Sequence, residues 1–176
     1  MKAKTIADIA PQKMRASGFR DWTMPPPFNN FDHMVIREAS STDTPTIKQL
    51  LAQLGYPDLN EADVAQKIAD YEQASYKLLV SEHEGRVTGF IALHTFDIFH
   101  SIGRIGRITA FCVDENIRGS GIGSRLMEAA EAWFATHGCT KLEVTSNERR
   151  TATHAYYKNK GWTEDSRRFV KYLKGN

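Results

Sequence analysis

The chain has 176 residues, of which 41% are hydrophobic and 25% charged, and its net charge is +2. This composition is typical of a globular domain with one core, and so small a net charge gives no reason to expect a nucleic-acid partner. No apolar run approaches the roughly 18 residues of a membrane helix, and the first residues lack the apolar core of a secretory signal. We therefore expect a cytoplasmic protein that is not bound to a membrane.

The sequence divides into two regions. Residues 1–33 form an N-terminal extension that contains the triple proline 25–27, which favours an extended segment. Residues 34–176 carry regular apolar patterns and form the predicted domain. Cys112 and Cys139 lie in apolar runs, so we expect buried thiols and no disulfide framework. No zinc spacing occurs, and no metal site is expected.

Two helices are predicted to follow a short first strand that starts at residue 34. Ser41 or Thr42 can cap the first helix, which Gly55 closes. Asn60 can cap the second, over residues 61–73.

The remaining apolar runs have the two-residue period of strands or the longer period of helices. They predict strands over residues 76–81, 86–96, 105–113, 141–145 and 168–173, and helices over residues 122–137 and 149–159. This order indicates an α+β fold, an α/β sandwich built around a mixed sheet.

A glycine-rich loop joins the strand over 105–113 to the next helix. Residues 113–125 read V-D-E-N-I-R-G-S-G-I-G-S-R. Glycines leave backbone N–H groups accessible, and the first N–H groups of a helix have no internal partner and lie at its positive end. The loop therefore predicts a site for a phosphate or diphosphate. A tight strand-to-helix turn without a ligand is the alternative.

The spacing of this loop excludes two common phosphate motifs. A P-loop needs a Gly-Lys-Ser or Gly-Lys-Thr ending, which is missing here. A dinucleotide fingerprint starting at Gly119 would require glycine at position 124, which is Ser124. The pattern that fits is R-x-x-G-x-G, filled by Arg118, Gly121 and Gly123.

A second motif lies near the C-terminus. Residues 143–162 read E-V-T-S-N-E-R-R-T-A-T-H-A-Y-Y-K-N-K-G-W. With R-x-x-G-x-G before it, this segment resembles the GNAT family of N-acetyltransferases, over roughly residues 34–173. The resemblance implies a mixed, mostly antiparallel sheet with helices on both faces. It also implies a splayed strand pair that holds acetyl-CoA as co-substrate.

The resemblance implies a role for each matching residue. The thiolate that leaves during acetyl transfer needs a proton, and Tyr157 matches the family's tyrosine acid. Tyr156 is expected to be a core aromatic residue. The implied coenzyme-binding residues are Phe111, Cys112, Val113, Arg118, Gly119, Ser120, Gly121, Ile122, Gly123, Ser124, Asn147, Arg150 and Tyr157.

The general base is less well defined. Many family members carry a glutamate on the strand before the loop, but the facing positions here are Arg107, Thr109 and Ala110. His94 and His100 are candidate bases, because histidine accepts protons near neutral pH. A water chain to bulk solvent is the alternative. In a further departure, Arg150 takes the place of an asparagine that meets the coenzyme in many family members, and it could instead reach a phosphate or a substrate anion.

The predicted activity is acetyl transfer from acetyl-CoA to a primary amine of a small molecule, by direct attack in a ternary complex. Leu93-His94 through Ile105-Gly106, and 145–147 with later residues, resemble the aminoalkylphosphonate and small-amine acetyltransferases, which act on compact amines that bear an anion. Two alternatives remain: a protein acetyltransferase, or a coenzyme-binding module without transfer activity. An edge strand or the N-terminal extension offers a surface for a homodimer.

Overall fold

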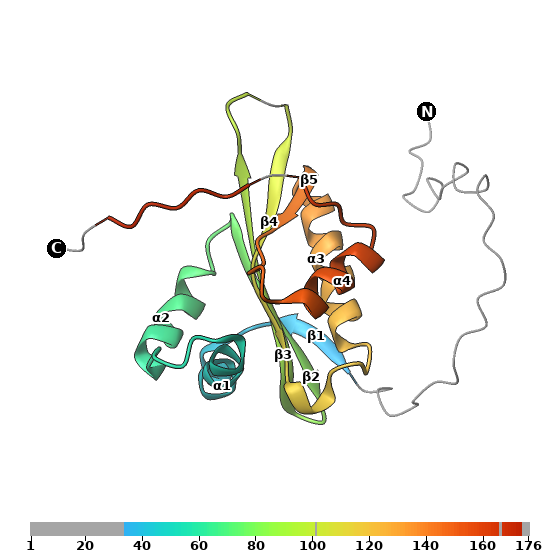
Figure 1. Ribbon diagram of the computed structural model, residues 1–176. Coiled ribbons are helices and arrows are strands. Elements are labelled where there is room, and N and C mark those ends of the chain that lie inside the picture. Colours follow the sequence, from blue (N-terminus) through green and yellow to red (C-terminus); the bar gives the residue numbers. More distant parts are fainter. Residues whose placement is uncertain (1–33, 101, 166, 174–176) are drawn as a thin grey trace, which may run out of the picture. The chain divides into compact units, whose positions relative to one another are not determined.

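The computed structural model describes residues 34–100, 102–165 and 167–173, and a five-stranded sheet is at its centre (Figure 1). The strands are β1 (Val35–Glu38), β2 (Tyr76–His83), β3 (Arg86–Asp97), β4 (Arg104–Val113) and β5 (Cys139–Val144). They lie in the order β1-β2-β3-β4-β5. The first four pair antiparallel, whereas β5 runs parallel to β4. The predicted mixed, mostly antiparallel sheet is confirmed.

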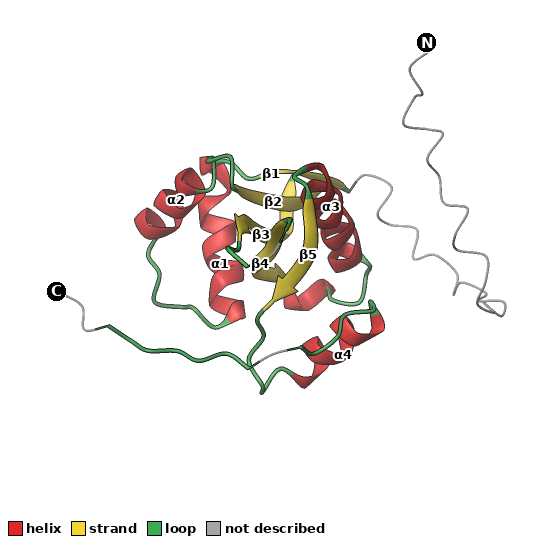
Figure 2. Cartoon of the chain, turned by 90° about the horizontal axis from the view of Figure 1, so that it is seen from above, coloured by secondary structure: helices red, strands yellow, loops and turns green. Residues whose placement is uncertain are grey.

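Helices cover both faces of this sheet, as Figure 2 shows. On one face lie α1 (Thr44–Leu54) and α2 (Glu61–Asp70); on the other lie α3 (Ile122–Thr136) and α4 (Thr151–Asn159). Two short 3-10 helices, η2 (Ser41–Asp43) and η3 (Glu115–Ile117), precede α1 and α3. The predicted extension over residues 1–33 lies outside the described residues.

Each face of the sheet has its own apolar core. Side chains of α1, α2 and the central strands form one cluster, and burial of each large aliphatic residue contributes about 1.5–3 kcal/mol. Its members are Ile47, Leu50, Val64, Ile68, Val80, Phe90 and Cys112. On the other face α3 packs closely because Gly106 has no side chain: a Cβ there would lie 2.5 Å from Phe134 Cδ1.

The helix ends partly follow the predicted caps. Gly55 closes α1 with φ of 103°, and the Asn60 side chain accepts a 2.9 Å hydrogen bond from the Asp63 N–H. The predicted cap of the first helix is wrong, because Ser40 instead begins the 3-10 turn η2. A tertiary ion pair explains the difference: Arg37 on β1 binds the buried Asp43 at 2.7 Å and fixes this turn before α1 starts. The second helix ends at Asp70, not at residue 73.

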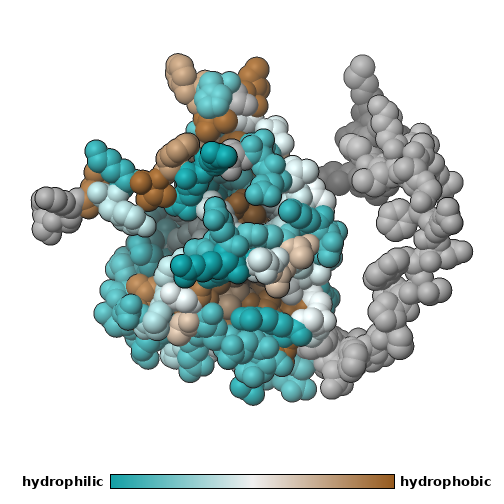
Figure 3. Space-filling view, in the orientation of Figure 1, coloured by the Kyte–Doolittle hydropathy of each residue, from teal (hydrophilic) through white to brown (hydrophobic). Residues whose placement is uncertain are grey.

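The predicted last strand over residues 168–173 is wrong. The structure assigns no strand there, and Phe169 and Tyr172 are 92% and 91% exposed. Figure 3 shows apolar residues on this segment and at the tip of the β3–β4 hairpin. An alternating pattern specifies a strand only where a partner edge pairs with it. Cys112 is buried as predicted, but Cys139, which opens the edge strand β5, is only half-buried.

Candidate active site

Strands β4 and β5 separate partway along their length. Their pairing runs from Arg104 with Cys139 to Ile108 with Val144 and ends there. β4 continues to Val113, paired only with β3, and the β3–β4 register shifts at Ala92, just where β5 departs. A shift of this kind bends a strand locally. Over its last five residues β4 thus has one edge that no described strand covers.

The backbone groups on this open edge can be assigned from the neighbouring hydrogen bonds. The Asp114 N–H donates to the Thr88 carbonyl of β3 over 3.0 Å. Successive strand residues direct their N–H and C=O groups to opposite edges, so those of Phe111 and Val113 face away from β3. Consistently, Arg118 Nε donates to the Val113 carbonyl over 3.2 Å. The edge therefore offers hydrogen-bonding groups to an extended, amide-containing ligand.

The glycine loop leads from this edge into α3. Gly119 and Gly121 have φ of 84° and 92°, in the left-handed region that favours glycine. Gly121 is the N-cap of α3, and its carbonyl accepts from the Ser124 N–H over 3.0 Å. The N–H groups at the start of the helix have no acceptor within it and carry the positive end of its dipole. Among the described residues, apart from the two chain neighbours of each glycine, no atom lies within 4 Å of a Cβ built on Gly119 or Gly121, so the loop is open on that side.

Two side chains of the loop make hydrogen bonds to nearby backbone carbonyls. Ser120 Oγ donates to the Ile117 carbonyl over 2.6 Å, and Arg118 binds Val113 as described. Both contacts hold the loop in place. The backbone N–H groups, and not the Ser120 hydroxyl, remain the main candidates for an anion.

Tyr156 and Tyr157 on α4 occupy different positions. The Tyr156 hydroxyl donates to the Gly123 carbonyl over 3.3 Å, and its half-buried ring lies near Phe111. Tyr157 is only 7% exposed and packs against Tyr156 and Trp162. Burial first, and then Tyr156, raises the pKa of Tyr157 to about 12. Tyr157 therefore keeps its proton at neutral pH, and Tyr156 lies against the first turn of α3.

The segment between β5 and α4 crosses to α1. Arg150 Nη2 donates to the Leu54 carbonyl at the end of α1. Asn147 Oδ1 accepts from the Arg149 N–H over 3.0 Å and so shapes the turn before α4. Ser146, two residues past the last paired residue of β5, has a buried Oγ with no hydrogen-bond partner among the described residues. A buried hydroxyl without a hydrogen-bond partner is rare in folded proteins.

An aromatic floor lies on the α1/α2 face of the sheet; we define it as Tyr76, His94 and Phe96. The His94 ring is stacked 4.2 Å from Tyr76 and 5.4 Å from Phe96. Burial, and then the nearby Arg107 charge, lowers the pKa of His94 below its ordinary value. An open hollow of about 500 Å³ adjoins the floor, lined by Lys67, Asp70, Tyr71, Gln73 and Tyr76.

The other candidate base, His100, does not lie beside the aromatic floor. His100 is exposed in the turn of the β3–β4 hairpin, beyond the last pair Asp97 with Arg104. Conversely, sequence reasoning missed Glu143 of β5, which is the register partner of Arg107 and forms an ion pair with it. A carboxylate thus lies beside β4, although it comes from the parallel neighbour.

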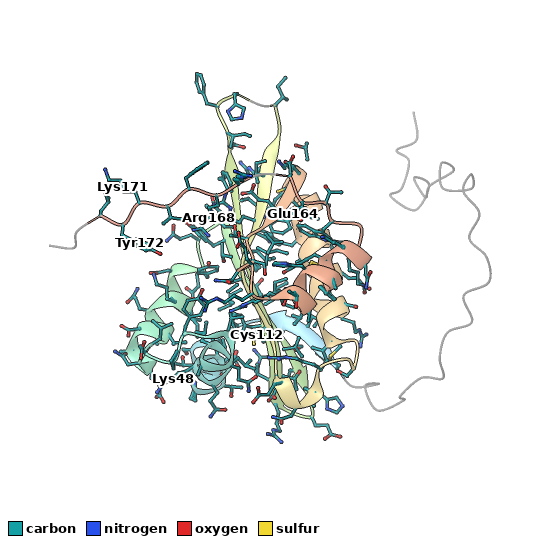
Figure 4. All side chains as sticks on the ribbon, viewed as in Figure 1. Lys48, Cys112, Glu164, Arg168, Lys171 and Tyr172 are labelled. Carbon is teal, nitrogen blue, oxygen red and sulfur yellow. The ribbon has the colours of Figure 1, made fainter. Side chains whose placement is uncertain are left out.

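Cys112 lies near the centre of the sheet (Figure 4). Burial raises the pKa of its thiol, more than the Arg118 and Arg150 charges lower it. Within the part of the chain that the structure describes, no group of three or more His, Cys, Asp or Glu residues could hold a metal ion. No helix in that part is long and apolar enough to span a membrane.

Comparison with known proteins places this geometry in a family. The model of the acetyltransferase (GNAT) family matches residues 44–162, and the chain belongs to that family of acetyl-CoA-dependent N-acetyltransferases. The aminoalkylphosphonate N-acetyltransferase of Salmonella typhimurium is 29% identical over 142 residues, which cover 78% of this chain and 90% of that protein. An aminoglycoside N(6')-acetyltransferase of Stenotrophomonas maltophilia is 28% identical, with 75% and 88% covered.

A solved structure supports the fold independently. The aminoglycoside N-acetyltransferase AAC(6')-Iy, in complex with CoA, superposes with a TM-score of 0.70 at 18% identity. The match covers 81% of this chain and 95% of that one. At this identity the likeness supports the shared fold only.

Proposed function

We propose that this protein transfers the acetyl group of acetyl-CoA to a primary amine of a small molecule, by direct attack in a ternary complex. One observation carries the proposal: the open edge of β4 is followed, after the short helix η3, by the glycine loop at the start of α3. A ligand with an amide-containing arm and a diphosphate at one end matches both features. The names of the curated relatives support an amine as the acceptor.

The residues at this edge fit the coenzyme. The N–H groups of the loop and of the first turn of α3 would hold the diphosphate, and those of Phe111 and Val113 would pair with the pantetheine amides. The buried Ser146 Oγ, which has no hydrogen-bond partner among the described residues, would bind the same arm from the β5 side. Arg150 ties the β5–α4 segment to the Leu54 carbonyl at the end of α1.

Two side chains would move the protons. Bound acetyl-CoA supplies the activated thioester, and an amine must lose a proton before it can attack it. His94 would accept this proton, since its lowered pKa keeps the imidazole neutral at pH 7. As the carbon–sulfur bond breaks, Tyr157 would donate its proton to the sulfur, and the second proton of the nitrogen would restore the phenol through solvent.

The test is release of free thiol from acetyl-CoA across small amines, aminoglycosides, polyamines and peptides. We expect thiol release with a small primary amine, matched by an equal amount of the N-acetylated product in mass spectrometry. Release with peptides alone would replace the proposal with protein acetylation. If no acceptor causes thiol release while calorimetry shows that acetyl-CoA binds, the proposed transfer is contradicted.

A further inference from the structure

Two consecutive hydrogen bonds join the end of α2 to the central strands. The hydroxyl of Tyr71, the C-cap residue of α2, lies 2.7 Å from Thr109 Oγ1 of β4, which itself donates to the Ala92 carbonyl of β3 over 3.2 Å. A threonine hydroxyl has one proton, and Thr109 gives it to Ala92, so Tyr71 is the donor to Thr109. We call this arrangement the Tyr71–Thr109 link.

Thr109 is the extra residue of a bulge in β4. Ala92 pairs with Ala110, and the next β3 residue, Leu93, pairs with Ile108, so Thr109 has no register partner on β3. An extra residue of this kind bends its strand and increases the local twist. Ile108 is also the last residue of β4 that pairs with β5. The link is therefore attached at the position where the open edge of β4 begins.

The bulge determines which residues of β4 present their backbone groups at the open edge. A register shift of one residue turns every later side chain to the opposite face of the sheet. Without the extra residue, Phe111 would turn away from Tyr156, and Cys112 would leave the core that it forms with α1 and α2. The two cores thus require the bulge, and the link holds its geometry. Because Thr109 is exposed, we expect a protein without the link to remain folded.

Tyr71 also contacts the aromatic floor. Its half-buried ring packs edge-on against Tyr76, with the ring centroids 5.0 Å apart, and lines the open hollow beside the floor. Burial raises the pKa of Tyr71 more than the hydrogen bond to Thr109 lowers it, so at neutral pH the phenol keeps the proton that the link needs. One side chain thus joins the floor that contains His94 to the start of the open edge.

We propose that Tyr71 is a positioning residue for acetyl transfer: through Thr109 it holds the bulge of β4 and so orients the N–H groups of the open edge. With the diphosphate at the glycine loop, the coenzyme arm would run back along β4, and its thioester end would come closest to Thr109. The inference rests on the acetyl transfer proposed above. A misplacement of about 1 Å can slow a reaction about 10²-fold, whereas coenzyme binding, which depends on many contacts, should change little.

Two substitutions remove the link from opposite ends. Tyr71→Phe removes the donor and keeps the ring, and Thr109→Val removes the hydroxyl and keeps the β-branched shape. Each should lower kcat by about 10- to 100-fold, while calorimetry shows a CoA dissociation constant within about threefold of the wild-type value. Thr109→Ser retains the hydroxyl and should recover most of kcat. The double variant should be no slower than the slower single variant, because both substitutions remove one interaction.

Thr88→Val is the matched control. Thr88 is the extra residue of the other bulge, in β3 between the pairs of Gly89 with Ser81 and Val87 with Glu82. Its Oγ1 also donates to a carbonyl of the neighbouring strand, that of Ser81, over 3.2 Å. The variant therefore loses the same kind of hydrogen bond at a bulge away from the open edge. It should melt at least as early as Thr109→Val and keep a kcat near that of the wild type.

Amide hydrogen exchange in the CoA-bound protein gives a measurement that does not depend on transfer. Without the link, the amides of Ala110 and Phe111 should exchange about tenfold faster or more, since local opening of the strand becomes easier. The Thr88→Val control should leave these two amides at wild-type rates.

The outcomes separate this inference from the proposed function. A wild-type kcat in either link variant, additive losses in the double variant, or an equal loss in Thr88→Val would overturn the role of Tyr71. If the wild type releases no thiol with any acceptor, the proposed transfer fails and exchange alone decides. Unchanged exchange would then also overturn the inference, and faster exchange would retain Tyr71 as the residue that positions the coenzyme-binding edge.

Discussion

Ile108 and Val144 are the last residues of β4 and β5 that pair in register. Beyond them β5 ends at once, while β4 runs five residues further into the glycine loop. This divergence creates the open backbone edge and places the Arg107–Glu143 pair next to the point of separation. Just beyond this point lies Ser146, whose buried Oγ has no hydrogen-bond partner among the described residues.

Ser146→Ala should have opposite effects on stability and on coenzyme affinity. Removing a buried hydroxyl that lacks a partner leaves stability unchanged or raises it by up to about 1 kcal/mol. If the hydroxyl binds the coenzyme arm, its loss weakens CoA binding by about 2- to 10-fold. Thermal melts and calorimetry measure the two effects. Thr145→Ala, at the exposed neighbouring residue, should leave CoA affinity unaltered; equal CoA affinity in Ser146→Ala and the wild type would remove Ser146 from the site.

Tyr157→Phe should lower kcat by about 10²- to 10⁴-fold, the range for a general acid, with CoA affinity nearly unchanged. With a pKa of about 12, the phenol stays protonated at neutral pH. The adjacent Tyr156→Phe is the matched control: it also removes one phenol, but one that donates to Gly123. We expect less than a tenfold loss of kcat in the control. Similar kcat values for the two variants would rule out Tyr157 as the acid.

Gly121→Val should weaken CoA binding at least tenfold. With φ of 92° a β-branched residue is strained, and the side chain would enter the open space beside the loop. Gly85→Val is the control, because Gly85 has φ of 73°, equally open surroundings and a place in the β2–β3 turn. Both variants should melt at lower temperature, by a similar amount. A wild-type dissociation constant for Gly121→Val would place the diphosphate elsewhere.

His94→Phe keeps an aromatic ring between Tyr76 and Phe96 but cannot accept a proton. Wild-type kcat/KM should fall as the pH drops through the His94 pKa, which lies below about 6.5, because only neutral imidazole accepts a proton. In the variant this fall of kcat/KM at low pH, the acid limb of the pH profile, should disappear. Its kcat near pH 7 should be about 10²- to 10⁴-fold lower than that of the wild type. Should the limb persist unchanged, a water chain would be the acceptor of the proton.

The sequence predicts the local features of the site better than its long-range ones. The glycine loop, the strand before it and the helix with Tyr156 and Tyr157 are short motifs whose spacing can be read directly. Glu143 and Arg107 lie 36 residues apart in sequence, and their proximity depends on the register of two parallel strands. The burial of the Ser146 Oγ depends on the path of the chain after β5 ends. Neither is a property of a local pattern.

The predicted last strand shows the same limit of prediction from local sequence patterns. Residues 168–173 have apolar side chains that favour a strand, but a strand needs a paired neighbour, and the described segment has none. His100 is a candidate base from its residue type and its place near the end of a predicted strand, and only the hairpin geometry shows that it lies in an exposed turn. The chemical role of a side chain can be proposed from its residue type, whereas its position in the molecule is known only from the fold.

The most direct test of direct transfer is the initial velocity of thiol release over a matrix of acetyl-CoA and amine concentrations. A ternary complex predicts intersecting double-reciprocal lines and no acetylated protein by intact mass. The raised pKa of the buried Cys112 thiol agrees with this, because a thiol must ionise to attack a thioester. Parallel lines, with acetyl-enzyme at Cys112, would show a covalent relay and contradict direct attack.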